Sequence, residues 1–344
     1  MQIVHSERHQ LHATAGLRPE AHPSLTAEVP ARAEVILAAL QAAGLGPTTT
    51  PSDYGLAPIL AVHEPELVTF LRTLYGRFTD QFGATDAVYP ETFAVRQARR
   101  KPTGLLGLLG YYTFGTDCPV VEGTWAASYW SVQCALSAAE LVRSGERAAY
   151  ALCRPPGHHA AADLYGGFCY LNNAATAVRH LQAGAPAGTR VAVLDVDYHH
   201  GNGTQSIFYA DPSVLYCSLH ADPDWEYPYY WGAADERGAG PGEGFNRNWP
   251  LPPATDDARY LAALDEAVAA IRAFAPRYLV VSAGFDLVAG DPVAIAGFAV
   301  STAGVGAIGQ KIAQLDLPTV IVQEGGYLLE RLGANALAFL RPFA

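Results

Sequence analysis

Two aspartates and a histidine, each separated by one residue, are the side chains of this sequence best suited to chemistry. Asp195, Asp197 and His199 follow the apolar run 191–194, which is typical of a buried strand in a parallel sheet. Side chains at positions i, i+2 and i+4 of a strand share one face, so we expect the three to point in the same direction. Ligands of open α/β sheets bind beyond the carboxyl ends of the strands. The spacing therefore predicts a divalent-metal site at this strand end.

Polar side chains follow four more segments that are predicted strands. They are His158 and His159 after 149–153, His220 after 214–219, Asp286 after 278–282, and Glu324 to Tyr327 after 319–323. A single aspartate after a strand most often caps a helix or forms a turn. If the strands are parallel and adjacent, however, all of these clusters meet at one edge of the sheet. Their coincidence favours a functional site there.

Three of these residues suit a catalytic metal. A catalytic zinc ion takes three protein ligands and keeps one position open for water. Asp197, His199 and Asp286 would supply the ligands, although two carboxylates and one imidazole also suit Fe(II), Co(II) or Mn(II). A metal of this kind lowers the pKa of its water ligand and polarises a carbonyl group, which predicts metal-assisted hydrolysis.

Three further side chains suit the same reaction. His158 or His159, as a neutral imidazole, could accept the proton of the water and return it to a leaving amine. The hydroxyl of Tyr327, which follows two glycines, could donate a hydrogen bond to the developing oxyanion. Together with the metal ligands, these residues predict the hydrolysis of an amide.

The remaining pattern predicts an α/β fold with a doubly wound parallel sheet flanked by helices. Helical spacing occurs at 31–43, 65–77, 125–144, 173–182, 256–274, 292–315 and 333–340. Strands that alternate with helices of this length indicate a parallel sheet covered on both faces. Residues 82–125 fit neither pattern and are too long for an ordinary connection, so we expect a functional loop region there. Residues 200–203 are expected to form a flexible polar loop.

Composition restricts the class of protein. Of the 344 residues, 50% are hydrophobic, and no linker or internal repeat divides them, so we expect one large domain, residues 1–344. A net charge of −11 argues against a nucleic-acid partner, because phosphate binding needs a basic face. Five widely spaced cysteines without a CxxC pair indicate reduced thiols in a cytoplasmic protein. We expect neither a signal peptide nor a membrane partner.

Six stretches of the chain resemble the histone deacetylase superfamily. They are 154–159 (RPPGHH), 166–173 (GGFCYLNN), 194–205 (LDVDYHHGNGTQ), 218–220 (SLH), 282–286 (SAGFD) and 324–327 (EGGY). They occur in order across more than half of the chain. The start 1–12, the stretches 110–112, 123–125 and 332–335, and the long segment 82–125 further resemble the acetylpolyamine amidohydrolases within that superfamily.

The resemblance implies the arginase/deacetylase fold and a reaction centre of eight residues. These are Asp197, His199 and Asp286 as zinc ligands, His159 as general base and acid, His158 as its electrostatic partner, Tyr327 as the residue that polarises the carbonyl, and Asp195 and Asn202 as the residues that orient His158 and His159. The implied enzyme is a zinc-dependent amidohydrolase that removes acetyl groups from small N-acetylated amines.

The resemblance also implies a substrate tunnel and structural cations. Phe168 and Tyr227 would line the tunnel, and the carbonyl of Gly167 would bind the amide N–H of the substrate. A potassium ion beside the zinc would be held mostly through backbone oxygens of Asp195, Asp197, His199, Ser218 and Leu219. A second monovalent cation would match Phe208, Asp211 and Val214.

The segment 82–125 implies a homodimer. In acetylpolyamine amidohydrolases the matching segment builds an interface that narrows the mouth of the active site, and its acidic residues help to bind the distal ammonium group. Here Leu106 replaces one acid, and Asp117 is one methylene shorter than the glutamate of the family. We therefore expect acetylputrescine or acetylcadaverine as substrates rather than long polyamines.

Other functions remain as alternatives. An acyl-lysine protein deacetylase is disfavoured because a narrowed mouth would exclude a folded protein. A deacylase of another small N-acyl amine stays open because Leu106 adds apolar surface. An arginase-like enzyme with two manganese ions would need more bridging carboxylates. A non-catalytic binding module is disfavoured by the complete set of reaction-centre residues.

Overall fold

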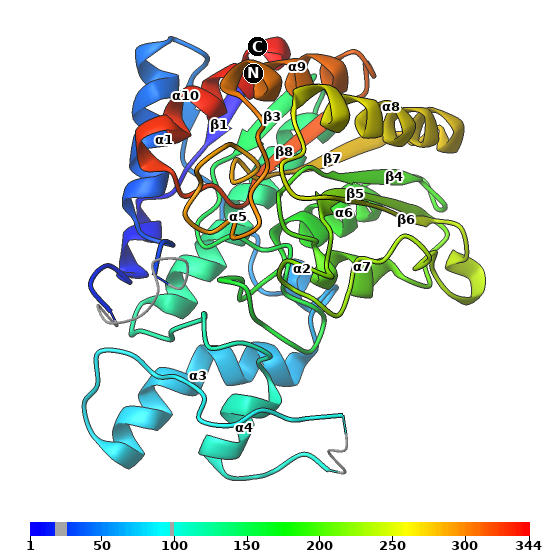
Figure 1. Ribbon diagram of the computed structural model, residues 1–344. Helices are drawn as coiled ribbons and strands as arrows, with labels where there is room; N and C mark the ends of the chain where they lie inside the picture. The colour runs from blue at the N-terminus through cyan, green and yellow to red at the C-terminus, as the bar shows by residue number, and fades with distance from the viewer. Residues whose placement is uncertain (18–25, 97–99) are drawn as a thin grey trace.

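The computed structural model describes residues 1–17, 26–96 and 100–344, and within them it contains a single parallel sheet of eight strands (Figure 1). The strand order is β2-β1-β3-β8-β7-β4-β5-β6. The strands are β1 (Gln2–Val4), β2 (Thr48–Thr49), β3 (Ala148–Ala151), β4 (Val191–Asp195), β5 (Val214–Ala221), β6 (Asn246–Leu251), β7 (Tyr278–Ala283) and β8 (Thr319–Gln323). The expected doubly wound parallel sheet is confirmed.

Helices pack on both faces of this sheet (Figure 1). One face carries α5 (Thr124–Arg143), α6 (Asn173–Ala183) and α7 (Asn202–Phe208). The other carries α1 (Ala31–Ala42), α8 (Asp257–Phe274), α9 (Thr302–Ala313) and α10 (Leu329–Leu340). The short helix α2 (Ala57–Leu60) contacts α6.

Strand β4 illustrates why this sheet is buried on both sides. Ala192 and Leu194 point into the apolar cluster beneath α8 and α9, whereas Val191 and Val193 point into the cluster beneath α5 and α6. Because successive side chains of a strand alternate between faces, a continuous apolar run is required when helices cover both. Because the strands are all parallel, their carboxyl ends lie at one common edge of the sheet. The reaction-centre residues follow these strand ends in the sequence.

Several predicted boundaries need correction. The helix expected at 292–315 is only Thr302–Ala313, because Gly297 has a left-handed backbone with φ of 56° and the side chain of Ser301 caps the helix by accepting the N–H of Gly304. The last helix starts earlier than 333, at Leu329. Residues 200–203 are buried, and α7 begins within them at Asn202, so they are not the expected flexible loop.

The sequence pattern also missed three strands. β1 is only three residues long, β2 only two, and β6 contains Asn246, Arg247 and Asn248. None has the long apolar run by which strands are recognised, and each is stabilised by parallel pairing, β1 with β3, β2 with β1 and β6 with β5. Pairing with a distant strand, rather than local composition, determines these elements.

An extension that contains α3 (Pro65–Phe82) and α4 (Leu105–Tyr111) lies to one side of the sheet (Figure 1). Its apolar residues form a cluster of their own, which continues onto α5 through Val132 and Leu136. This cluster attaches part of the segment 82–125 to the main body. Residues 97–99 of that segment lie outside the described residues.

Two expectations about the chain can be compared with the structure. All five cysteines are buried free thiols. Among the described residues, no helix is both long enough and apolar enough to cross a membrane.

Candidate active site

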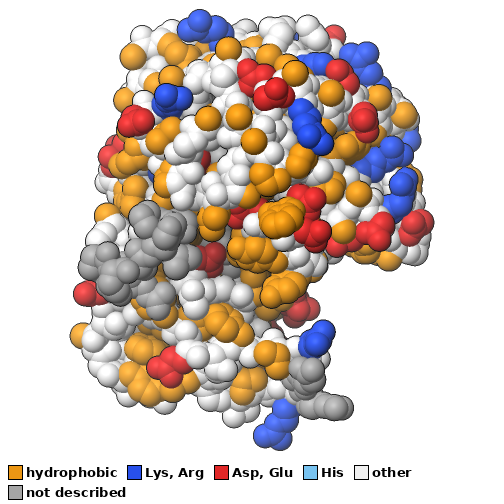
Figure 2. All heavy atoms as spheres, in the orientation of Figure 1, with side chains coloured by type: hydrophobic (Ala, Val, Ile, Leu, Met, Phe, Trp, Pro, Cys, Tyr) orange, Lys and Arg blue, Asp and Glu red, His pale blue; other side chains and the backbone are white. Residues whose placement is uncertain are grey.

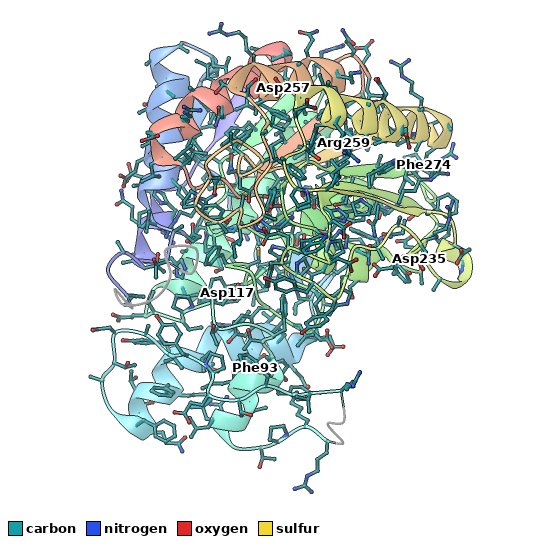
Figure 3. All side chains as sticks on the ribbon, in the orientation of Figure 1. Phe93, Asp117, Asp235, Asp257, Arg259 and Phe274 are labelled. Carbon is teal, nitrogen blue, oxygen red and sulfur yellow. The ribbon has the colours of Figure 1, made fainter. Side chains whose placement is uncertain are left out.

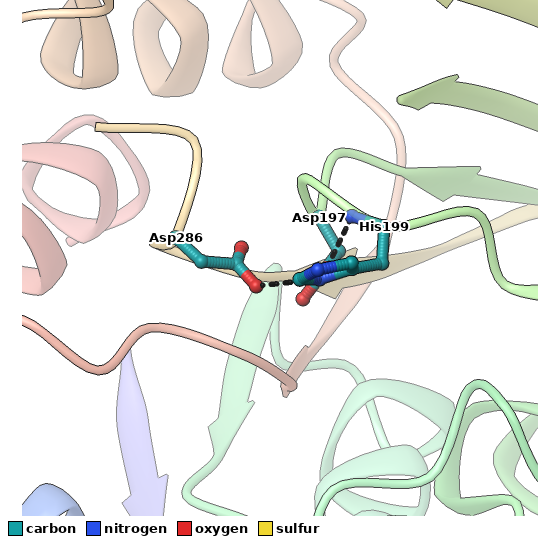
Figure 4. A group of neighbouring side chains, drawn as sticks. All are labelled: Asp197, His199 and Asp286. Atoms are coloured by element: carbon teal, nitrogen blue, oxygen red, sulfur yellow. Dashed lines mark hydrogen bonds and ion pairs between the residues drawn. The ribbon is translucent and has the colours of Figure 1, made fainter. Parts of the chain in front are cut away.

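Asp197, His199 and Asp286 come together beyond the ends of β4 and β7 (Figure 4). One ligand atom from each lies within 4.8 Å of the others, and all three residues are buried. The Nδ1 atom of His199 is 3.1 Å from Oδ2 of Asp286 and 3.4 Å from Oδ1 of Asp197. The three predicted metal ligands therefore converge on one point.

Backbone donors fix both carboxylates in this arrangement. Oδ2 of Asp197 accepts a hydrogen bond from the N–H of Gly325 at 2.7 Å, and Oδ1 accepts one from the N–H of His199 at 2.8 Å. Oδ1 of Asp286 accepts one from the N–H of Tyr198 at 3.1 Å. The oxygen Oδ2 of Asp286 is left to face His199 and the convergence point.

This donor set fits a divalent metal ion. In a tetrahedral zinc site with metal–ligand distances of about 2.0–2.2 Å, neighbouring ligand atoms lie about 3.3–3.6 Å apart. The separations of His199 Nδ1 from Asp286 and Asp197, 3.1 and 3.4 Å, are close to that spacing. A cation would also offset two carboxylates that are buried in a place where unpaired charge is costly.

Asp195 does not join this group, although its spacing predicted a shared direction. β4 ends at Asp195, so the alternation of a strand does not extend to Asp197 and His199. The carboxylate of Asp195 instead accepts a hydrogen bond from the hydroxyl of Tyr216 at 3.0 Å and lies 3.1 Å from Nδ1 of His158. Asp195 thus contacts the histidine pair rather than the convergence point.

The two adjacent histidines have different partners and different charge. Nδ1 of His159 lies 2.7 Å from Oδ1 of Asn202. Burial disfavours the charge of His158, but the carboxylates of Asp197 and Asp195 outweigh it and raise its pKa to about 10. Burial, reinforced by the charges of His158 and His199, lowers the pKa of His159 well below its usual 6.5. Environments that separate two pKa values in this way are typical of acid–base pairs.

Because an amide oxygen can only accept a hydrogen bond, Nδ1 of His159 is the protonated nitrogen. The lone pair of the neutral ring is then on Nε2, and this nitrogen can accept a proton. His159 lies on the same cavity as His199, so this nitrogen is available at the reaction centre.

Tyr327 lines the same cavity, and the guanidinium group of Arg32 packs against the face of its ring. The guanidinium carbon of Arg32 is 4.3 Å from the centre of the Tyr327 ring. Arg32 also donates to the carbonyls of Gly326 and Glu324, both at 2.6 Å. Burial raises the pKa of Tyr327 well above 10, so its hydroxyl is a hydrogen-bond donor at neutral pH.

The cavity has a volume of about 270 Å³ and a largely apolar wall. The lining residues that the sequence analysis named are His158, His159, His199, Gly167, Phe168, Tyr227, Asp117 and Tyr327. Figure 2 shows hydrophobic side chains gathered in the middle of this face of the molecule. Tyr229 and Ile295, which line the cavity, are exposed, as are Trp225 and Tyr230 of the same chain segment as Tyr229.

Sequence reasoning missed part of the wall. Glu226, Tyr229, Val293 and Ile295 line the cavity, yet none belongs to a segment that was assigned to the site. The aromatic run 225–231 and the sequence Gly290-Asp-Pro292 were the available signals. Both stretches lie outside helices and strands, so no periodic pattern in the sequence predicts where their side chains point.

The two residues of segment 82–125 that were expected to affect substrate recognition, Asp117 and Leu106, lie in different places. Asp117 lines the cavity close to the point where the extension meets the main body, and its Oδ1 accepts a hydrogen bond from the N–H of Gly167 at 3.3 Å (Figure 3). Burial raises the pKa of Asp117. Leu106 is exposed on α4 and does not line the cavity of its own chain.

The first predicted cation position lies at the carboxyl end of β4, beside the reaction centre, and the second lies near the amino-terminal ends of β4 and β5. Ser218 pairs with Asp195 in the β4–β5 register, and its hydroxyl oxygen is 2.8 Å from Nδ1 of His220. Around the second position, the carbonyl of Phe208 accepts from the N–H of Asp211 at 2.9 Å, and the carboxylate of Asp211 accepts from Arg179 at 2.7 Å. These contacts describe the environment of both positions, and the assignment of cations stays a prediction.

Comparison with known proteins agrees with this geometry. The model of the histone deacetylase domain matches residues 26–342. The chain belongs to the histone deacetylase family. It is 45% identical to acetylpolyamine amidohydrolase 1 of Pseudomonas aeruginosa over 100% of this chain and 99% of that protein. Membership of this family identifies the chain as a deacetylase or amidohydrolase enzyme.

Solved structures of this family show the same fold. The acetylpolyamine aminohydrolase of Burkholderia pseudomallei superposes with a TM-score of 0.90 at 45% identity, covering 100% of this chain and 98% of that one. The HD domain of HDA15 superposes with a TM-score of 0.82 at 30% identity, covering 99% and 88%. The expected arginase/deacetylase fold is confirmed.

We expect Asp286→Ala to abolish binding of the divalent metal. A site with three protein ligands and an open position cannot lose one ligand and keep its affinity. Elemental analysis after dialysis should find about one metal ion per wild-type chain and almost none in the variant. Asp256→Ala is the control, because Asp256 caps α8 through the N–H of Arg259. Full metal content in Asp286→Ala would contradict the site.

Proposed function

We propose that this enzyme is a zinc-dependent amidohydrolase that removes acetyl groups from small N-acetylated amines. The convergence of Asp197, His199 and Asp286 on one cavity with a neutral His159 carries this proposal. The name of the Pseudomonas aeruginosa relative, identical at 45% of positions over the whole chain, supports an acetylated polyamine as the substrate class.

Asp197, His199 and Asp286 would hold the zinc ion, which when bound lowers the pKa of a water ligand and polarises the acetyl carbonyl. Nε2 of His159 accepts a proton as water adds to the carbonyl carbon. The same proton passes to the amine nitrogen as the C–N bond breaks, so the products are acetate and a free amine. His158, held by Asp195, stays protonated and stabilises the developing negative charge.

The walls of the cavity orient the amide. The hydroxyl of Tyr327 donates to the carbonyl oxygen as negative charge develops on it. The carbonyl of Gly167 accepts the amide N–H, and Phe168 and Tyr227 enclose the alkyl chain of the amine. Asn202 keeps His159 in the tautomer that this reaction needs.

A potassium ion would stabilise the backbone beside the reaction centre. Backbone oxygens of Asp197, His199 and Leu219, with Asp195 and Ser218, would bind it. The side chain of Ser218 lies among buried polar groups, which suits this role.

The distal ammonium group of the substrate would be recognised by Asp117, which is the acid of segment 82–125 that lines the cavity. Leu106 is exposed away from the cavity, so it would approach a site only from a second chain. We therefore propose a homodimer through residues 82–125 that narrows the mouth. Leu106 offers no charge to a second ammonium, which favours acetylputrescine or acetylcadaverine over acetylspermine.

Tyr327→Phe should lower kcat by about 10²–10³-fold, the usual cost of removing an oxyanion donor. Its metal content should not change, because Tyr327 is not one of the three convergent ligands. His159→Ala should cost at least as much as His158→Ala if His159 alone transfers the proton. Steady-state kinetics on acetylputrescine tests both expectations, and a His159→Ala enzyme with wild-type kcat/KM would overturn the assignment.

Charge substitutions in segment 82–125 should change substrate preference. A hydrogen bond to a charged group contributes about 1.5–3 kcal/mol, which is about 10- to 150-fold in kcat/KM at about 1.4 kcal/mol per tenfold. Asp117→Asn should lower kcat/KM for acetylputrescine by this factor. Leu106→Glu should raise kcat/KM for acetylspermidine and acetylspermine. N-butylacetamide, which has no distal charge, is the control substrate. If neither variant changes the ratio of kcat/KM between the charged substrates and the control by more than about twofold, segment 82–125 does not recognise the charge of the substrate.

Sedimentation should show a dimer. The segment 82–125 carries the exposed side chain of Leu106 on α4, next to an apolar cluster that extends from α3. Analytical ultracentrifugation at micromolar concentration should give twice the chain mass of 36.6 kDa. A fully active monomer would remove the proposed interface.

A further inference from the structure

Asp291 connects two irregular segments that form neighbouring parts of the cavity wall. Its Oδ2 accepts hydrogen bonds from the N–H groups of Tyr327, at 2.7 Å, and Leu328, at 3.0 Å. Its Oδ1 accepts a third from the N–H of Val293 at 3.0 Å. Asp291 is only 5% exposed, so all three bonds are shielded from water.

The two segments need such a link because neither has regular structure near the cavity. Tyr327 follows Gly325 and Gly326, and Gly326 has a left-handed backbone with φ of 115°. Leu328 is the N-cap residue of α10, and its own side chain provides no capping hydrogen bond. The carboxylate of Asp291 accepts the N–H of this N-cap residue, one of the N–H groups at the start of a helix that have no partner within the helix.

Side chains of these two segments pack together with Phe168. Phe168, Val293 and Tyr327 form a small buried apolar cluster, and the rings of Phe168 and Tyr327 are 5.6 Å apart. Van der Waals contact alone does not set the rotation of a tyrosine hydroxyl, because it has no direction. The two backbone bonds of Asp291 to Tyr327 and Leu328 do have direction and act directly at the residue that carries the ring.

We propose that Asp291 is a positioning residue that sets the direction of the Tyr327 hydroxyl by holding its backbone against the Val293 wall. This inference rests on the proposed role of Tyr327 as the oxyanion donor. A misplacement of about 1 Å at a catalytic group can cost about 100-fold in rate, so a clamp on the backbone of Tyr327 affects turnover without touching the substrate.

The ionised carboxylate is the form that can accept all three bonds. Burial, followed by the nearby charge of Asp286, raises the pKa of Asp291 to about 7, while the three N–H donors oppose this rise. Kinetic comparisons should therefore be made at an alkaline pH, at which the carboxylate is ionised in the wild-type enzyme. The expected differences between variants then report hydrogen bonding alone.

Two substitutions separate the clamp from the local turn. In Asp291→Asn the side-chain oxygen can keep the bond from Val293, two residues ahead, while the NH₂ group replaces the acceptor for Tyr327 and Leu328. Asp291→Ser can also keep the local bond to Val293 but does not reach the other segment. Because serine introduces no opposing donor, it remains informative if the asparagine variant folds poorly.

Both variants should lower kcat by about 10- to 100-fold, less than the loss of the tyrosine hydroxyl itself. KM for acetylputrescine and the metal content should stay within about twofold of wild type, since the walls and the three ligands remain. Asp256→Asn is the matched control: it makes the same chemical change at an aspartate that accepts a backbone N–H at the N-terminus of α8, and it should leave kcat unchanged.

A double-mutant cycle decides between positioning and general structural support. In the Tyr327→Phe background there is no hydroxyl to position, so Asp291→Asn and Asp291→Ser should change kcat by less than about twofold. If their full effect persists in that background, Asp291 acts through something other than the hydroxyl and the inference is wrong. If Tyr327→Phe itself leaves kcat unchanged, the proposed role of Tyr327 fails first, and this inference fails with it.

Discussion

Two carboxylates buried close together are the constraint on which the rest of this active site depends. Asp197 and Asp286 are almost inaccessible to solvent, and both lie within reach of a single imidazole nitrogen of His199. Removing charged groups from water costs several kcal/mol each unless other groups compensate. The backbone N–H groups of Gly325 and Tyr198 provide part of this compensation, and a divalent cation at the convergence point would provide the remainder. The fold can bury these groups because the ends of β4, β7 and β8 deliver them to one edge.

A second layer of buried charge supports the loop that carries Tyr327. Glu28 lies between Arg32, at 2.9 Å, and Arg154, at 2.8 Å, and all three are at most 3% exposed. Arg154 also donates to the carbonyl of His9 at 2.6 Å, while Arg32 reaches the carbonyl of Gly326, 294 residues away in the sequence. The contact between Arg32 and Gly326 joins the first and last parts of the chain beside the reaction centre. Removing one partner of the buried ion pairs would leave an unpaired buried charge, which is strongly destabilising.

The different protonation of His158 and His159 follows from the buried carboxylates around them. Asp195 lies next to His158 and not next to His159, which contacts the neutral amide of Asn202 instead. One histidine is therefore held protonated and the other neutral, although they are adjacent in the sequence. The ring of Tyr227 lies 5.0 Å from the ring of His159, and apolar surroundings of this kind strengthen such electrostatic differences.

The sequence alone predicted the class of fold and the polar residues that gather at the ends of the strands, because both predictions depend on local spacing. The run 191–194, like its counterparts in β7 and β8, is apolar enough to be recognised without knowledge of its neighbours. Only the tertiary structure decided which polar residue faces which, since that depends on contacts between segments far apart in the chain. Asp195 turned toward His158 because β4 ends there, and Leu106 was placed outside the cavity of its own chain. No role was assigned to Asp291 from the sequence, because its bonds to Tyr327 and Leu328 exist only after folding brings residues 36 and 37 positions away against it.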